Sequence, residues 1–306
     1  MNKTSQETLS GCIMASKYPS TDYVMSGHVA CPGCGAVIAM KFALQALGPK
    51  TILVIPACCW AVVAGVHPQT SLKVPVLHTA FETSGAAASG VRAALDMKGD
   101  TKTTVVAWAG DGGTFDIGFQ SLSGACERNE NFLYVCYDNE AYMNTGVQRS
   151  SATPYGAQTT TTPKNAWKSH RKKNIIEALA AHRIPYAATV NIAFPDDMIR
   201  KFKKAKDIQG TRFIHAYASC PTGWRIPSDQ TVAISRLAVQ TNLFPLYEVE
   251  NGTDYTINYH GDRPVSEYLK VQGRFKHLTL KDHADIQEMV NEDWQLLNKK
   301  INMDVK

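Results

Sequence analysis

The stretch from Trp108 to Gly146, WAGDGGTFDIGFQSLSGACERNENFLYVCYDNEAYMNTG, decides the fold of this chain. An apolar run enters Gly110–Gly113 (GDGG), and a helical pattern follows from about Asp116. A second apolar run, 132–138, ends directly before Asn139. Strand, glycine turn, helix and strand in this order are typical of a crossover between parallel strands. The stretch therefore predicts an α/β fold.

The same alternation continues along most of the 306 residues. The apolar runs predict strands, buried on both faces, at 51–57, 103–110, 132–138 and 212–219. Helical patterns lie between them at about 34–47, 84–98, 116–129, 174–182 and 195–207, and later at 228–242 and 283–300, around a strand-like run at 243–252. These patterns indicate a doubly wound, mostly parallel sheet with helices on both faces. We divide the chain into an N-terminal tail or arm (1–26), the α/β domain (27–252) and a C-terminal helical extension (253–306).

Composition excludes several classes of function. The formal net charge of +5 is small for this length, and no segment concentrates enough Lys and Arg for a nucleic-acid groove. The densest basic run, KSHRKK at 168–173, is more typical of a solvated loop or a subunit contact. The sequence shows neither an apolar run long enough to span a membrane nor a signal peptide at its start. We therefore expect a cytoplasmic protein without a nucleic-acid or membrane partner.

The glycine turn has the composition of a diphosphate site. Glycines between a strand and a helix let backbone N–H groups approach a diphosphate, and the helix N-terminus favours its charge. Asp111 inside such a turn makes sense as a ligand for Mg²⁺ that bridges the phosphates. Asn139 follows 28 positions later, at the end of the next strand, and would reach the same edge of the sheet. A simple tight turn is the alternative, whereas a nicotinamide site is disfavoured because no G-x-G-x-x-G follows a strand.

Five of the eight cysteines lie in loops or at strand ends. They are the C-x-x-C pair Cys31 and Cys34, then Cys58 and Cys59 after the first strand, and Cys220 before a proline. Four such thiolates at one edge could hold a 4Fe-4S cluster, which accepts scattered cysteines. Zinc or inert thiols remain alternatives, whereas a thioredoxin-type redox pair would need neither Cys59 nor Cys220. Spacing alone favours the cluster without deciding it.

Four stretches together carry a family resemblance. They are GHVACPGCG (27–35), AGDGGTFDIG (109–118), YDNEAYMNTGVQRSSATPYGA (137–157) and CPTGW (220–224). A GDG turn followed by Asn about 25–30 positions later resembles the thiamine diphosphate motif, with Mg²⁺ on the diphosphate. Together with H-x-x-C-x-G-C-G it resembles the β subunit of the 2-oxoacid:ferredoxin oxidoreductases, of which pyruvate:ferredoxin oxidoreductase is the best known. The resemblance covers about 27–252, which would bind thiamine diphosphate and one 4Fe-4S cluster.

The resemblance implies a role for individual residues. Cluster ligands would be Cys31, Cys34, Cys59 and Cys220, with Cys59 favoured over Cys58; Mg²⁺ ligands would be Asp111, Asn139 and the backbone carbonyl of Ala141. Asn144 would face the thiazolium and the substrate as the catalytic residue of this chain. Residues that contact the cofactors would be Gly110, Asp111, Gly112, Gly113, Asn139, Ala141, Asn144, Cys59 and His28. For His28, a contact with a phosphate or a cluster sulfide and a purely loop-ordering role are both open.

The resemblance also implies a reaction and partners. The reaction would be oxidative decarboxylation of a small 2-oxoacid, by default pyruvate, with coenzyme A, yielding acyl-CoA and CO₂ and reducing ferredoxin through the cluster. An α subunit would supply the activating Glu and the substrate-selecting residues, although Glu82 and Glu140 are candidates for that Glu within this chain. Further clusters would lie on a γ or δ subunit. Alternatives are branched-chain 2-oxoacids, 2-oxoglutarate, oxalate without coenzyme A, a non-oxidative thiamine-dependent decarboxylase, and a non-catalytic metal-binding electron-transfer subunit.

Overall fold

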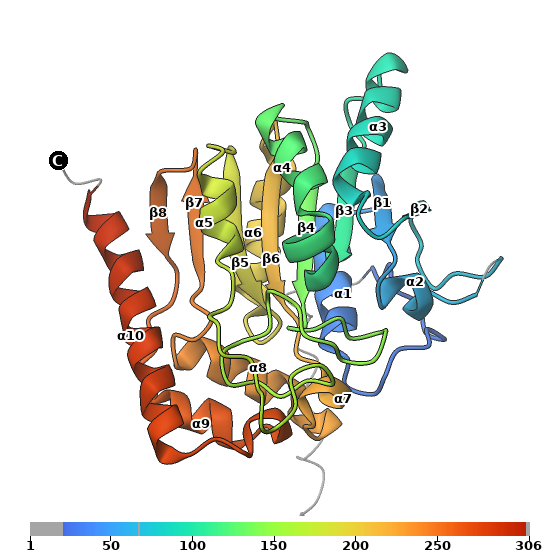
Figure 1. The fold of residues 1–306 in the computed structure, drawn as a ribbon. Helices are drawn as coiled ribbons and strands as arrows, with labels where there is room; N and C mark the ends of the chain where they lie inside the picture. The colour runs from blue at the N-terminus through green and yellow to red at the C-terminus, as the bar shows by residue number, and fades with distance from the viewer. Residues whose placement is uncertain (1–20, 67, 304–306) are drawn as a thin grey trace, which may run out of the picture.

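The computed structural model, which describes residues 21–66 and 68–303, contains one eight-stranded sheet in this part of the chain (Figure 1). The order across the sheet is β2-β1-β3-β4-β6-β5-β7-β8. The first six strands of this order are parallel to one another. At one edge, β7 runs antiparallel to β5, and β8 runs antiparallel to β7. The strands are β1 (Thr51–Pro56), β2 (Val76–Thr79), β3 (Thr104–Gly110), β4 (Leu133–Asp138), β5 (Tyr186–Asn191), β6 (Arg212–Tyr217), β7 (Tyr247–Glu250) and β8 (Asp254–Ile257). The predicted α/β class and the mostly parallel sheet are confirmed.

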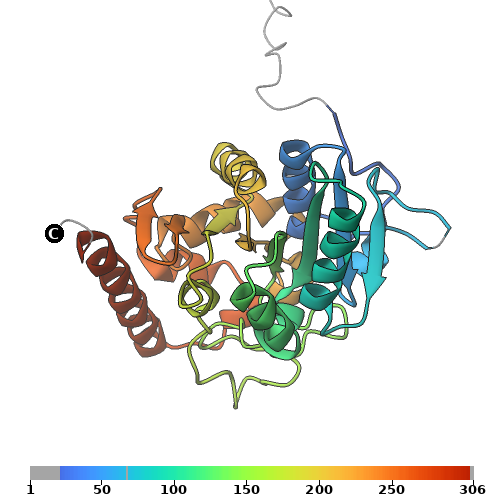
Figure 2. The same ribbon diagram turned by 90° about the horizontal axis from the view of Figure 1, so that it is seen from above.

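Helices cover both faces of the sheet. Figure 2 shows α1 (Gly35–Leu47) and α6 (Pro195–Asp207) on one face, with α4 (Phe119–Glu127) and α5 (Ile175–Ala180) on the other. The sequence produces this arrangement because neighbouring residues of a strand point to opposite faces. In β3, Val106 and Trp108 join the core beneath α1 and α6, whereas Val105 and Ala107 join the core beneath α4 and α5. An uninterrupted apolar run is therefore what a strand between two helical layers needs.

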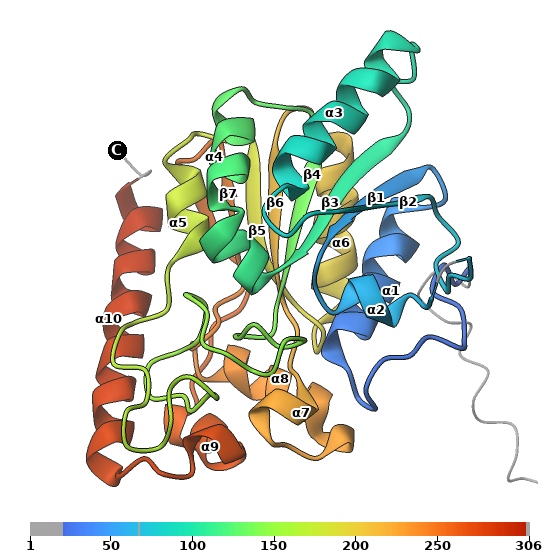
Figure 3. The same cartoon turned by 45° about the vertical axis from the view of Figure 1, so that its right-hand side comes forward.

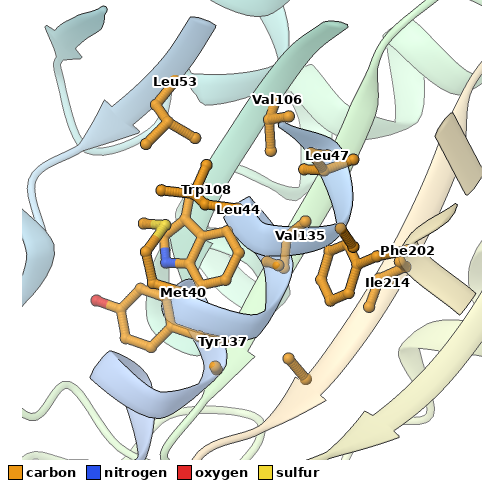
Figure 4. Packing of buried hydrophobic residues seen from close by; sticks show 14 of the residues in the cluster. Met40, Leu44, Leu47, Leu53, Val106, Trp108, Val135, Tyr137, Phe202 and Ile214 are labelled. Carbon is orange, nitrogen blue, oxygen red and sulfur yellow. The ribbon is translucent and has the colours of Figure 1, made fainter. Parts of the chain in front are cut away.

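The core beneath α1 and α6 contains large aromatic side chains (Figure 4). Trp108 of β3 stacks on Tyr137 of β4, with ring centroids 6.2 Å apart. Phe202 of α6 lies in the same cluster as Leu47 of α1 and is fully buried. This packing fixes β3 and β4 side by side, and their carboxyl ends carry the candidate site.

The carboxyl ends of the parallel strands form the lower edge of the sheet in Figures 1 and 3. Short helices and long loops gather there, including the loop from Asn144 to Lys173 that follows β4. The helices at this edge are α2 (Trp60–Val63), α7 (Pro221–Trp224), α8 (Thr231–Gln240) and α9 (Val265–Lys270). Ligands of open α/β sheets bind at the carboxyl ends of the strands, so this edge is where a site is expected.

Several elements differ from the sequence prediction. Three strands, β2, β5 and β8, were not predicted; β2 and β8 have four residues each, and β5 has six. The helix expected from 116 begins at Phe119, because Gly112–Ile117 forms a wider π-helix, a rare element that is frequent at functional sites. The segment 253–306 contains α9 and α10 (Leu280–Met303), but also β8, which pairs with β7. Of the expected tail 1–26, residues 1–20 lie outside the described residues.

Helix α3 (Ser84–Met97) completes the layer with α4 and projects beyond the body of the molecule at its C-terminal end (Figure 3). None of the helices described between residues 21 and 303 combines the length and the apolar character that crossing a membrane would require.

The core packing generates a stability prediction. Phe202→Ala removes a fully buried ring from the cluster between α1 and α6, and we expect the free energy of unfolding to fall by about 3–5 kcal/mol. Met97→Ala removes a side chain that is 91% exposed, and its effect should stay within about 0.5 kcal/mol. Urea denaturation followed by circular dichroism measures both. Equal losses in the two variants would contradict the assigned core.

Candidate active site

A cavity of about 170 Å³ opens at the carboxyl ends of β1, β3 and β4. The glycine turn lines one wall, and the residues directly after β4 line another. Of the predicted cofactor contacts, it brings together Cys59, Gly110, Asp111, Gly112, Gly113, Asn139, Ala141 and Asn144. These residues come from three strand ends, which the parallel topology delivers to the same edge.

The side-chain amide of Asn139 lies between two oxygen atoms in the wall of this cavity. One amide atom is 3.0 Å from Asp111 Oδ1 and 3.0 Å from the carbonyl oxygen of Ala141, and as the amide nitrogen it donates hydrogen bonds to both. Octahedral Mg²⁺ with ligands at about 2.0–2.1 Å requires neighbouring oxygens about 2.9 Å apart. With the amide oxygen turned to this position, the three groups would have the spacing that the predicted Mg²⁺ ligand set requires.

The carboxylate of Asp111 is buried and accepts a hydrogen bond from a side chain of the loop that follows β4. Ser150 Oγ donates a 2.5 Å hydrogen bond to its Oδ2. Burial and the neighbouring charge of Asp138 raise the pKa of Asp111 well above its usual value. The charge of Lys172 offsets this rise only in part, so the buried carboxylate lies in an environment that a divalent ion would stabilise.

The turn beneath these oxygens tolerates no side chain at Gly112. A Cβ atom added there would lie 2.3 Å from two ring carbons of Tyr142. Tyr142 is itself fixed, since its hydroxyl donates to Asp116 Oδ2 at 2.8 Å. Asp116 also accepts from the backbone N–H of Ser151 at 3.1 Å. The glycine thus lets the wall of the cavity close against an anchored ring.

The predicted cluster cysteines lie at the same edge. Cys34 precedes α1, and the N–H of Gly35 donates to Ser219 O at 3.1 Å, which joins the C-x-x-C loop to the residue before Cys220. Burial raises the pKa of Cys220 to about 11, and the thiols of Cys34 and Cys31 add to the rise. Within residues 21–66 and 68–303, however, no three His, Cys, Asp or Glu side chains come close enough to hold a metal ion.

Cys58 and Cys59 point to different surroundings. Burial raises the pKa of Cys59 to about 12, and Cys58, Cys220 and Cys34 contribute as neighbouring thiols. Burial also raises the pKa of Cys58, whose thiol hydrogen-bonds with Tyr137 and with the backbone of Gly110. The choice of Cys59 over Cys58 as a cluster ligand stays a prediction.

Trp224 connects the segment after Cys220 to Asn139. Its indole N–H donates to the carbonyl oxygen of Asn139 at 2.8 Å, and the side chain is buried. The guanidinium of Arg274 lies 4.0 Å from the centre of its ring. No sequence signal indicated the link to Asn139.

Two lysines of the basic run at 168–173 are not solvated, whereas residues 169–171 and 173 are exposed as its sequence suggested. Lys168 is buried and donates to the carbonyl oxygen of Ser151. Burial lowers the pKa of Lys168 to about 8. Lys172 forms ion pairs with Asp138 and, at 2.9 Å, with Glu140. The prediction is wrong for these two lysines because buried carboxylates and carbonyls compensate the desolvation of their ammonium groups.

The remaining candidates have mixed outcomes. Glu140 is buried and pairs with Arg274 at 2.6 Å as well as with Lys172, so its carboxylate is engaged. Glu82 is exposed and does not line the cavity. Asn144 is exposed at the cavity rim. His28 lies outside the cavity lining, and its Nδ1 is buried without a partner.

Residues 57–216 match the family described as thiamine pyrophosphate enzyme, C-terminal TPP binding domain. The ketoisovalerate oxidoreductase subunit VorB of Pyrococcus furiosus is 52% identical over 293 residues, covering 92% of this chain and 94% of that protein. The pyruvate synthase subunit PorB of Methanothermobacter marburgensis is 48% identical over 286 residues, covering 92% and 99%. This chain belongs to the 2-oxoacid:ferredoxin oxidoreductase family. It corresponds to the β subunit, which confirms the resemblance.

The domain match locates the thiamine part of this family member. It includes Asp111 and Asn139, whereas Cys31, Cys34 and Cys220 lie outside it. A solved 2-oxoglutarate:ferredoxin oxidoreductase from Magnetococcus marinus has the same fold, with a TM-score of 0.57 and 24% identity, over 74% of this chain and 81% of that one. Three of the four expected cluster cysteines are thus additions to the thiamine domain.

The turn generates a prediction about cofactor binding. Gly112→Ala forces its new methyl group against the Tyr142 ring, and we expect thiamine diphosphate affinity to fall about 100-fold, because small displacements in such sites are costly. Isothermal titration of the purified complex measures the affinity. Gly90→Ala is the matched control, since its Cβ meets nothing within 4 Å on α3. Wild-type affinity in Gly112→Ala would show that the turn does not contact the cofactor.

Proposed function

We propose that this chain binds Mg²⁺ and the diphosphate of thiamine diphosphate at the glycine turn, holds one 4Fe-4S cluster beside it, and acts with partner subunits on a small 2-oxoacid. The observation that carries the proposal is the convergence of the Asp111 carboxylate, the Asn139 side-chain amide and the Ala141 carbonyl in the wall of the cavity next to Gly112. The ligands of the proposed metal site would be one carboxylate, one amide and one carbonyl. This set suits a hard cation that also binds phosphate oxygens.

Each residue of the wall has a task in this proposal. Asp111, Asn139 and Ala141 would hold the metal, and the backbone from Gly110 to Gly113 would face the diphosphate. Asn144, at the cavity rim, would donate a hydrogen bond to the 2-oxoacid and so orient it. When bound, thiamine diphosphate supplies the electron sink that decarboxylation needs.

Two observations support the cluster. Burial raises the pKa values of Cys34, Cys59 and Cys220, and neighbouring thiols add to each rise: Cys31 to those of Cys34 and Cys220, and Cys34 to those of Cys59 and Cys220. The indole N–H of Trp60, directly after Cys59, is buried without a partner and would find an acceptor in a cluster sulfide. His28 Nδ1 is a second buried atom without a partner on the same side of the molecule, and we assign it the same kind of contact.

The lining of the cavity supports the proposal that partner subunits complete the active site. Asp111 is the sole acid among its lining residues in the described part of the chain, and the proposal commits it to the metal. The carboxylate that activates the thiamine ring would then come from an α subunit, together with the residues that select the substrate. Electrons would leave through clusters of a γ or δ subunit to ferredoxin, and coenzyme A would accept the acyl group.

Pyruvate is the substrate that we propose first. The pyruvate synthase subunit of Methanosarcina barkeri is 52% identical over 272 residues, which supports this choice. Ketoisovalerate is the second candidate, because the subunit from Pyrococcus furiosus is equally similar. Oxalate and 2-oxoglutarate are further alternatives within the same chemistry.

The function is tested on the complex purified anaerobically with its own partner subunits. We expect thiamine diphosphate bound to the complex and reduction of a viologen dye with pyruvate only when coenzyme A is present. Ketoisovalerate, 2-oxoglutarate and oxalate are compared under the same conditions. Viologen reduction with another acid would replace the substrate, whereas bound thiamine without dye reduction by any acid would contradict the oxidoreductase assignment.

The cluster is tested by a pair of adjacent variants. Cys59→Ala should remove about four iron atoms per chain and the cluster's absorption, because a ligand is lost. Cys58→Ala should retain them, because its thiol faces Tyr137 and Gly110. Iron and sulfide analysis of both complexes measures the difference. Iron loss in Cys58→Ala with retention in Cys59→Ala would reverse the ligand assignment, and zinc in the wild-type complex would contradict the cluster.

A further inference from the structure

Four charged side chains are gathered behind the proposed metal ligands. Lys172 pairs with Asp138 and with Glu140, and Arg274 Nη2 lies 2.6 Å from Glu140 Oε2. His215 Nε2 lies 2.7 Å from Asp138 Oδ2, and burial lowers the pKa of His215. A neutral imidazole leaves two carboxylates balanced by two cations. Buried charges persist in folded proteins only when they are paired in this way.

Asn139 lies between the two carboxylates of this group. Asp138 and Glu140 are its chain neighbours, and each is held by Lys172. Glu140 has a φ of +67°, a left-handed backbone conformation that residues other than glycine rarely adopt. Such a conformation persists only where its surroundings impose it. Lys172 bridges the residues on both sides of Asn139 and is therefore placed to impose it.

Lys172 belongs to the far end of the loop that follows β4, and this loop contacts the metal turn at other points too. Ser150 donates to Asp111, and Thr153 Oγ1 donates to the carbonyl oxygen of Glu140 at 2.7 Å. The segment that supplies Lys172 thus contacts both strand ends of the proposed site.

We propose that Lys172 is a positioning residue for the metal: it fixes Asp138 and Glu140 and thereby the orientation of Asn139 toward Asp111. The inference rests on the metal site of the proposed function. The positive charge of Lys172 repels a bound cation. If this repulsion were the only effect of Lys172, removing its ammonium group would strengthen metal binding. A positioning role predicts the opposite sign, and this difference makes the proposal testable.

The test is a titration of the purified complex with Mn²⁺ in the presence of thiamine diphosphate, with the free ion followed by electron paramagnetic resonance. We expect Lys172→Met to weaken Mn²⁺ binding about 10- to 100-fold, as the loss of groups that orient metal ligands commonly does. Lys203→Met, at an exposed lysine of α6, is the matched control and should bind Mn²⁺ like the wild type.

A second variant covers the case in which Lys172→Met does not fold. Asp138→Asn combined with Lys172→Met leaves Glu140 and Arg274 as a balanced pair, because one charge of each sign is removed. We expect this double variant to melt near the wild-type temperature and still to bind Mn²⁺ at least about tenfold more weakly.

Each outcome decides between distinct conclusions. Mn²⁺ affinity equal to or tighter than that of the wild type, in whichever of the two variants folds, overturns the positioning role and leaves the metal site intact. A wild-type complex that binds thiamine diphosphate but no Mn²⁺ overturns the metal site itself, and the inference with it. Weakened binding in the variants beside an unchanged Lys203→Met supports both.

Discussion

A carboxylate, a side-chain amide and a carbonyl from two strand ends converge at about the spacing of a cation's ligands, and the surrounding structure holds them there. Asp111 and Asn139 reach the same edge because β3 and β4 are parallel neighbours, joined by Trp108 stacking on Tyr137. The Asn139 amide lies 3.0 Å from both Asp111 Oδ1 and the carbonyl oxygen of Ala141. The proposed cation would take the amide oxygen beside the other two, in place of the hydrogen bonds that the amide nitrogen donates to them.

The site is shared between elements that lie far apart in the sequence. Trp224, near the proposed cluster ligand Cys220, donates to the carbonyl oxygen of Asn139. Arg274, from the last third of the chain, stacks on Trp224 and pairs with Glu140. The proposed metal site and the proposed cluster therefore share one hydrogen-bonded framework. A displacement of the segment after Cys220 would be transmitted to Asn139 through a single indole N–H group.

The sequence predicted the fold class and the long strands because β3, β4 and β6 are apolar on both faces, a pattern that few other structures produce. It did not predict β2 or β8, since four residues carry too little periodicity, nor β5, whose sequence YAATVN has too few large apolar residues to form an apolar run. The glycines of the turn and Asp111 could be recognised as a motif in the sequence. The ion pairs of Lys172 could not be predicted, because a lysine in a basic run looks solvated unless its buried partners are known, and those partners are distant in sequence.

In the proposed site, one cation binds Asp111, Asn139 and the diphosphate at the same time. Electron–nuclear double resonance of Mn²⁺ in the complex with thiamine diphosphate tests it most directly. The account predicts couplings from the phosphorus nuclei, which are lost together with bound Mn²⁺ in Asp111→Asn. Mn²⁺ that shows only water protons, or phosphorus couplings that persist unchanged in Asp111→Asn, would contradict it.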